Sequence, residues 1–144
     1  MSTQNFQNHA KLVPLFHYVA LPLNLALIIG SFVNLSHSMQ NGEGVYSASL
    51  ICIAGICLML VAFFGRTFAL KAQDRAIRAE ENFRHFIATG KPLDSSLRLS
   101  QIIALRFASD AEFIALAKKA AEDKMSAKEI KQSIKDWKGD YNRV

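Results

Sequence analysis

Four histidines are the side chains in this sequence best suited to hold a metal ion or a haem. His17 and His37 lie near opposite ends of one apolar stretch, about 30 Å apart if that stretch is helical, so they cannot share a cofactor. His9 and His85 could approach His17 on one side of a membrane, but no HxxxH or HExxH spacing supports a metal site. We expect solvated or interfacial histidines, with no metal and no cofactor.

The other reactive side chains do not form a catalytic set. Cys52 and Cys57 are five residues apart in apolar sequence, about 140° around a helix, which favours small packing residues over a disulfide or a redox pair. Asp74 and Glu81 could carry protons at a membrane boundary, but adjacent arginines favour ion pairs. The sequence contains no GxSxG, P-loop or GxGxxG motif. We therefore expect a protein that is not an enzyme.

Two long uncharged segments dominate the first half of the chain. No Asp, Glu, Lys or Arg lies between Lys11 and Glu43, or between Glu43 and Arg66. Each segment exceeds the roughly 20 apolar residues that a helix needs to cross a bilayer. The first is too long for the apolar region of a cleaved signal peptide. The sequence predicts an all-α fold with a transmembrane helical hairpin.

The positive charges predict which way this hairpin faces. Lys11 precedes the first segment, Arg66, Lys71 and Arg75 follow the second, and the connection between the segments has no Lys or Arg. Because flanking Lys and Arg resist translocation, both termini should face the cytoplasm. The expected parts are a cytoplasmic tail (1–11), a first span (12–35), an external loop (36–44), a second span (45–68), a juxtamembrane helix (69–89) and a cytoplasmic helical module (90–144).

Small and polar residues mark a packing face within the two spans. Small side chains let helices approach closely in lipid, and an Asn amide gains from an interhelical partner. This face either holds the hairpin together or binds another membrane protein. Pro22 lies inside the first span and should bend it, because proline removes a backbone donor. The predicted transmembrane packing face comprises Asn24, Ser31, Ala48, Cys52, Gly55 and Ala62.

The second span should continue into water as one helix. Nothing between Phe63 and Ala88 breaks the helix, because this stretch has no Pro and no Gly after Gly65. Gly90 followed by Pro92 predicts the end of the helix. We call the apolar residues that recur every three and four positions here the alanine stripe, and we expect a partner helix on it. The chain's own C-terminal segment is the first candidate. The stripe comprises Ala69, Ala72, Ala76, Ala79, Phe83 and Phe86.

About three short helices are predicted after Pro92, with capping boxes at Ser109 to Glu112 and at Ser126 to Glu129. So few residues can hardly build a sufficient core alone, so the helices should fold back on the alanine stripe or on the membrane surface.

The last of these helices is expected to carry a basic face with an aromatic end, which is typical of an interfacial helix that binds anionic lipid. An ordinary solvated face is the alternative, and a basic helix-turn-helix that binds nucleic acid is unlikely on this pattern. The possible lipid or partner face comprises Lys128, Lys131, Lys135, Lys138 and Trp137.

Five stretches of the chain resemble a family of small bacterial membrane proteins known only as a domain of unknown function: Gln4–His9, Leu70–Arg75, Gln101–Ala108, Lys128–Lys131 and Trp137–Asp140. The resemblance covers nearly the whole chain. It implies a bacterial inner membrane and a two-span plan, and it brings no activity, cofactor or site.

These observations together predict a non-enzymatic accessory or scaffold subunit of a larger inner-membrane assembly, in contact with membrane lipids and with another membrane protein or a second copy of itself. A membrane-surface module that binds anionic lipid is the alternative, and a membrane-tethered nucleic-acid-binding module is the third reading.

Overall fold

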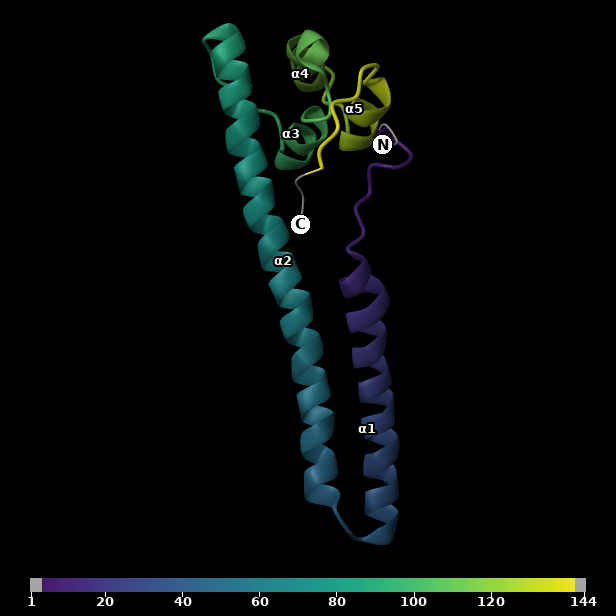
Figure 1. The fold of residues 1–144 in the computed structure, drawn as a ribbon. Helices are drawn as coiled ribbons and strands as arrows, with labels where there is room; N and C mark the ends of the chain where they lie inside the picture. The colour runs from purple at the N-terminus through teal and green to yellow at the C-terminus, as the bar shows by residue number, and fades with distance from the viewer. Residues whose placement is uncertain (1–3, 142–144) are drawn as a thin grey trace. The chain divides into compact units, whose positions relative to one another are not determined.

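A computed structural model describes residues 4–141, and the predicted all-α class is confirmed: the described residues form helices and no named strand (Figure 1). The elements in chain order are a π-helix η1 (Leu15–Ala20), α1 (Leu21–Asn41), α2 (Val45–Thr89), α3 (Leu99–Leu105), α4 (Asp110–Glu122) and α5 (Ala127–Ser133).

The chain divides into two compact units. The first, which we call the hairpin unit, is Leu12–Ala69. The second, which we call the module unit, joins residues 4–11 to residues 70–141. Helix α2 belongs to both units, and each unit is described by itself below.

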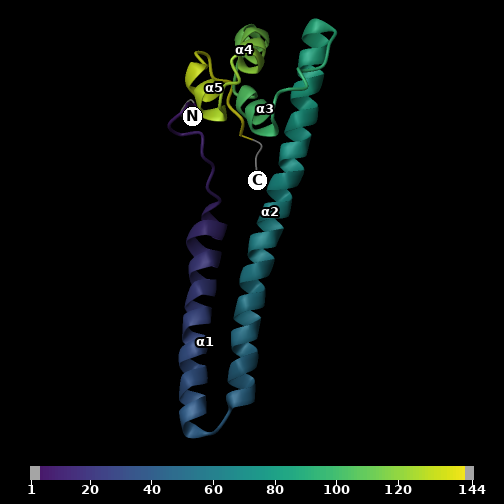
Figure 2. The ribbon, with the colours of Figure 1, turned by 180° about the vertical axis from the view of Figure 1, so that it is seen from behind.

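In the hairpin unit, α1 and the first part of α2 run side by side in opposite directions (Figure 2). The helical stretches Leu15–Asn41 and Val45–Thr89 are both long and apolar enough to cross a membrane. Only 6% of the apolar window of the first and 17% of that of the second are buried inside the chain. These side chains therefore do not form the interior of a water-soluble core, where most of them would be covered.

The helix type changes where the sequence places Pro22. Residues Leu15–Ala20 form a π-helix, and Pro22 then occupies the first turn of α1. Proline has no backbone N–H, so the regular α-helical hydrogen bond at this position cannot form, and a change of helical pitch next to it accommodates the loss.

The connection between the helices is shorter than the predicted loop 36–44. Helix α1 continues to Asn41, and Gly42 ends it with a left-handed backbone (φ 73°) whose N–H donates to the Ser38 carbonyl at 3.0 Å. The polar residues that suggested a loop are compatible with helix, whereas glycine at positive φ is a strong helix terminator. The predicted boundary at Leu35 is corrected accordingly.

The prediction that the second long helix continues without a break is confirmed. Helix α2 has 45 residues and ends at Thr89. Gly90 follows with φ 72°, and its N–H donates to the Phe86 carbonyl at 2.8 Å. Pro92 lies just beyond and cannot extend the helix.

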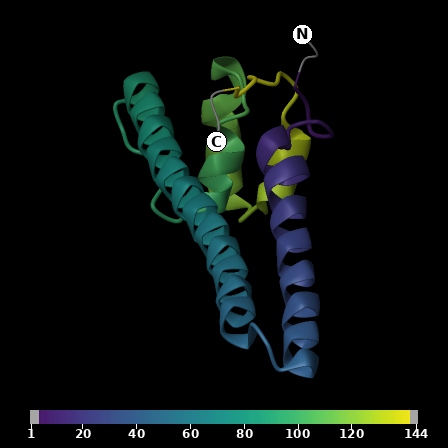
Figure 3. The same ribbon diagram turned by 60° about the horizontal axis from the view of Figure 1, so that its bottom comes forward.

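The module unit has a hydrophobic core of its own, in which α3 packs against both α4 and α5 (Figure 3). Its largest fully buried side chains are those of Leu105, Phe107, Phe113 and Ile130. Gln101 is also buried, and its amide joins the elements: the Oε1 atom accepts from the Arg98 N–H at 2.6 Å and the Nε2 atom donates to the Met125 carbonyl at 2.7 Å.

One of the two predicted capping boxes is confirmed and the other is wrong. The Ser126 hydroxyl accepts from the Glu129 N–H at 3.2 Å, and the Glu129 carboxylate accepts from the Ser126 N–H at 2.6 Å. Ser109 also precedes a helix, but its side chain makes no capping bond. The Glu112 carboxylate instead accepts from the N–H groups of Lys135 and Asp136, at 3.2 and 3.1 Å.

We predict that Ser126→Ala lowers the free energy of unfolding of the module unit by about 1 kcal/mol, because α5 loses its side-chain cap. Ser109→Ala is the matched control and should change this free energy by less than about 0.5 kcal/mol, since within residues 4–141 the Ser109 hydroxyl has no hydrogen-bond partner. Urea denaturation followed by Trp137 fluorescence measures both. Equal losses in the two variants would contradict the assignment of the caps.

The last helix ends at Ser133, earlier than the lysine spacing predicts. Ile134 is extended, and Trp137 forms an isolated antiparallel bridge with Ala108. The Ser109 N–H donates to the Asp136 carbonyl at 3.1 Å, and the Lys138 N–H donates to the Phe107 carbonyl at 2.8 Å. These backbone pairings, together with the Glu112 carboxylate, replace the hydrogen bonds that another helical turn would have made.

Candidate functional site

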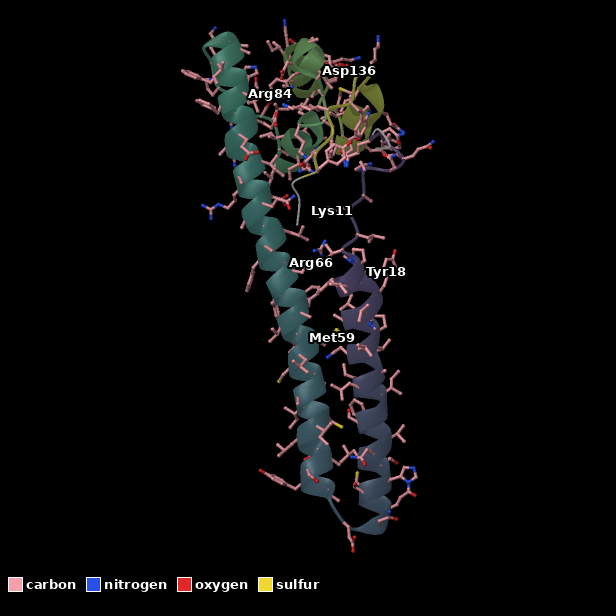
Figure 4. All side chains as sticks on the ribbon, in the orientation of Figure 1. Lys11, Tyr18, Met59, Arg66, Arg84 and Asp136 are labelled. Carbon is pink, nitrogen blue, oxygen red and sulfur yellow. The ribbon has the colours of Figure 1, made fainter. Side chains whose placement is uncertain are left out.

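Arg84 is the centre of a polar cluster in the module unit, and Figure 4 shows its side chain on α2 near the short helices. Its guanidinium donates to the Glu81 carboxylate at 3.1 Å, to the Asp110 carboxylate at 2.7 Å and to the Ala108 carbonyl at 2.8 Å. The guanidinium also lies over the Phe113 ring, 4.2 Å from its centroid. One side chain therefore ties α2 to the start of α4 and to the segment before it.

Glu81 is the buried acid of this cluster, with 8% of its surface exposed. Burial raises the pKa of its carboxyl because the charged form is desolvated, and the hydrogen bond and positive charge of Arg84 oppose this rise. Asp110, at the exposed end of the cluster, has its pKa lowered by its hydrogen bond to Arg84.

An open groove of about 500 Å³ adjoins this cluster. Its walls combine apolar side chains with charges of both signs, and no cysteine, serine or histidine lines it. Within residues 4–141 no group of three or more His, Cys, Asp or Glu side chains could hold a metal ion. The groove can therefore bind an amphipathic surface. The lining residues are Glu80, Glu81, Phe83, Arg84, Ile87, Ala88, Asp110, Phe113, Ile114 and Lys138.

Within the module unit, the N-terminal segment packs on the C-terminal residues, which the sequence analysis did not predict. The His9 ring lies 5.7 Å from Phe107 and 5.8 Å from Trp137 between centroids, and its Nε2 atom is 3.0 Å from the Lys131 ammonium. Gln4 bonds the backbone of Asp140, accepting from its N–H at 2.8 Å. The only signal for this docking was the Gln4–His9 stretch within the family resemblance, because polar residues at a terminus carry no packing pattern.

The predicted lysine face is not a helical face in the structure. Lys128 and Lys131 are on α5, while Lys135 lies in a bend after the helix and Lys138 lies beyond that bend. The Trp137 ring lies 5.0 Å from the Phe107 ring and packs against the buried core. The expectation of a continuous basic stripe with an interfacial tryptophan is corrected, because tertiary contacts end the helix.

Most of the predicted transmembrane packing residues are buried within the hairpin unit. Ser31 on α1, and Ala48, Cys52 and Gly55 on α2, are buried, whereas Asn24 and Ala62 are half-buried. Figure 4 shows the Met59 side chain between the same helices and Tyr18 on the outer side. Cys57 is exposed, so the two cysteines face different surroundings and are both free.

Gly55 sets how closely the helices of the hairpin approach. A Cβ atom at this position would lie 3.2 Å from Ile28 Cγ1 and 3.8 Å from Ile28 Cα. A Cβ atom at Gly65 would meet nothing within 4 Å. A side chain at the first position would therefore crowd Ile28, whereas a Cβ atom at the second position meets open space.

We predict that Gly55→Leu separates the two helices, because overpacking a close contact costs about 1–3 kcal/mol. Gly65→Leu is the matched control and should leave the hairpin closed. Migration in a denaturing detergent gel reports this, since an open hairpin migrates more slowly than a closed one. Identical migration of the two variants would show that Gly55 does not set the helix spacing.

Comparison with known protein families gives a match over residues 1–144, the whole chain. The chain belongs to DUF6526, a family of unknown function. No curated protein and no solved structure matches it. Family membership agrees with the resemblance found in the sequence, and it transfers no activity to the polar cluster or the groove.

In the structure of this DUF6526 chain, the chain's own C-terminal helices are not the partner of the alanine stripe. Ala72, Ala76 and Ala79 are exposed, and Phe83 and Phe86 keep 64% and 53% of their surface in solvent; Ala69, in the hairpin unit, is half-buried. Within the described residues, the C-terminal helices do not cover the stripe. They pack instead beside the next face of α2, where Ile77 and Glu81 are buried. Helix α2 has two faces that could pack against other helices. Sequence spacing alone does not show which of these faces the chain's own helices cover.

Helical spacing does not decide which acids pair with Arg84. Sequence spacing pairs Glu80 with Arg84, but Arg84 binds Glu81 and Asp110. Arg75 and Glu80 are both exposed, and within residues 4–141 neither forms an ion pair.

Proposed function

We propose that this DUF6526 chain is a non-enzymatic, two-span membrane protein that serves as an accessory or scaffold subunit of a larger assembly in the bacterial inner membrane. The observation that carries the proposal is the apolar surface left exposed near the end of α2. Phe83, Phe86 and Ile87 expose 64%, 53% and 69% of their surface. An exposed cluster of large apolar side chains on a water-facing helix is typical of a protein interaction surface.

Lipid is a poor explanation for that exposure. Phe83 follows the end of the apolar sequence at Gly65 by about 27 Å along a helix. The headgroup region on one side of a bilayer is only about 5–8 Å thick, so Phe83 lies in water if Gly65 marks the edge of the hydrocarbon. The charged residues from Arg66 to Glu81 between these positions agree with this placement.

The orientation follows from the basic residues that flank the two apolar helices. Lys11, Arg66 and Lys71 flank the ends of the two apolar segments that lead to the chain termini. The short connection between the two helices contains one charged residue, the acidic Glu43. The proposal therefore places both termini and the short helices in the cytoplasm. The mixed apolar and charged lining of the groove supports a binding role.

The lipid-binding alternative loses its structural support, because Trp137 packs on the core and the lysines do not share a helix face. Exposed Lys128 and Lys135 remain ordinary solvated cations. Nothing in the described residues adds support for nucleic-acid binding.

The proposal is tested by extracting the native protein from its own membranes in a mild detergent. Native electrophoresis and mass spectrometry should then find another membrane protein in fixed stoichiometry. Ile87→Ser should reduce its recovery, whereas Leu99→Ser, which changes an exposed residue on α3, should not. Recovery of the chain with no other protein would contradict an accessory role.

A further inference from the structure

We infer that the exposed part of the alanine stripe is a homodimer interface: α2 of one copy packs in parallel against α2 of a second copy, and Arg75 of each pairs with Glu80 of the other. The parallel arrangement rests on the proposed function, because two copies inserted in one membrane with the same topology point their α2 helices the same way.

The spacing of the stripe defines the register. Steps of three and four place Ala76 and Phe83 at positions a, and Ala72, Ala79 and Phe86 at positions d of a heptad. We call these five residues the seam, and all of them are exposed on a continuous helix. Small residues at the start of the seam allow close approach of two helices, and the two phenylalanines bury apolar surface at its end.

The flanks of this seam identify a second copy as the occupant. In the same register Arg75 is at position g and Glu80 is at position e of the following heptad. Parallel coiled coils pair a g residue of one helix with the e residue five positions further along its partner. A two-fold dimer therefore forms the pair twice, so the surface is complementary to itself.

Both charges are available for this pairing. They are exposed, and Arg84, the natural helical neighbour of Glu80, is occupied by Glu81 and Asp110. The module unit buries Ile77 and Glu81 on the adjacent face. Its C-terminal segment lines an open groove together with Ala76 and Glu80, and both of these residues remain exposed. The seam is shorter than the three to four heptads of a typical free coiled coil, but confinement to a membrane raises the effective concentration of the second helix.

Cysteine cross-linking of the full-length protein in membranes tests the interface. In a background with Cys52→Ala and Cys57→Ala, Ala79→Cys places one thiol at position d, and mild oxidation should produce a covalent dimer in high yield. Arg78→Cys, one residue earlier on an exposed position outside the seam, is the matched control and should give little dimer. Equal yields from the two positions, or none from Ala79→Cys, would overturn the inference.

Charge reversal tests the proposed ion pairs in the same assay. Arg75→Glu and Glu80→Arg should each lower the dimer yield of the Ala79→Cys protein about threefold to tenfold, because two attractive pairs become repulsive. The double variant exchanges the charges and should restore the yield. Failure of the double variant to recover, with both single variants impaired, would exclude this register.

The outcomes separate this inference from the proposed function. A cross-linked dimer with no other protein in the native complex supports the interface and contradicts the accessory role. A native complex with another membrane protein, but no cross-link at position 79, supports the accessory role and overturns the homodimer.

Discussion

Replacing Phe107 by alanine is expected to lower the free energy of unfolding of the module unit by about 3–5 kcal/mol. The Phe107 side chain is fully buried, and its ring contacts Trp137 and His9 at centroid distances of 5.0 and 5.7 Å. The guanidinium of Arg106 lies 4.6 Å from the same ring. Removing the ring leaves a cavity where the N-terminal segment, the C-terminal segment and α3 meet.

Urea denaturation of the full-length protein in a mild detergent measures this loss. Trp137 is the single tryptophan, so its fluorescence reports on the module unit, with far-ultraviolet circular dichroism as a second probe. Leu99→Ala is the control: it truncates an apolar side chain of α3 that is 38% exposed and should cost less than about 1 kcal/mol. Similar losses for both variants would show that Phe107 does not organise the core.

The sequence was sufficient to predict features that depend on local pattern. The lengths of the two apolar segments predicted two long helices. Gly90 predicted the end of α2, because glycine adopts the positive φ that ends a helix without a steric penalty. Ser126 and Glu129 predicted a capping box, because both partners lie within one helical turn.

Features that depend on contacts between distant residues could not be predicted. The spacing of Lys128 to Lys138 is compatible with a helix, yet Trp137 pairs with Ala108 and packs on Phe107. Glu112, which the sequence assigns to a local cap, instead accepts from the backbone N–H groups of Lys135 and Asp136. In each case a long-range contact replaces a weak local preference.

The face of α2 that the chain buries also depends on contacts between distant residues. A stripe of alanines and phenylalanines is the more apolar surface, but the chain buries Ile77 and Glu81 beside it. Burial of Glu81 is possible because Arg84 satisfies its carboxylate, and Arg84 is in turn fixed by Asp110 and the Ala108 carbonyl. Sequence periodicity identifies helix faces made of apolar residues. It does not identify a buried face that contains a charged residue, because burial of that residue depends on an ion pair.

Replacing Arg84 by methionine should therefore cost about 2–4 kcal/mol at pH 7, because it leaves the Glu81 carboxylate buried without its partner. The loss should depend on pH. Burial already raises the pKa of Glu81, so its contribution to stability is fully present at low pH and is lost as pH rises through the folded-state pKa. Without Arg84 that pKa rises further, so the deficit of the variant should grow from pH 4 to pH 8.

The double variant Arg84→Met, Glu81→Gln provides the decisive comparison, because it removes the buried charge together with its partner. It should recover to within about 1 kcal/mol of the wild type at pH 7, since replacing both members of a buried pair is often nearly neutral. Its deficit should no longer grow with pH over the range in which Glu81 titrates. A deficit in Arg84→Met that is the same at pH 4 and pH 8 would instead assign the role of Arg84 to its contacts with Phe113 and the Ala108 carbonyl, which do not titrate.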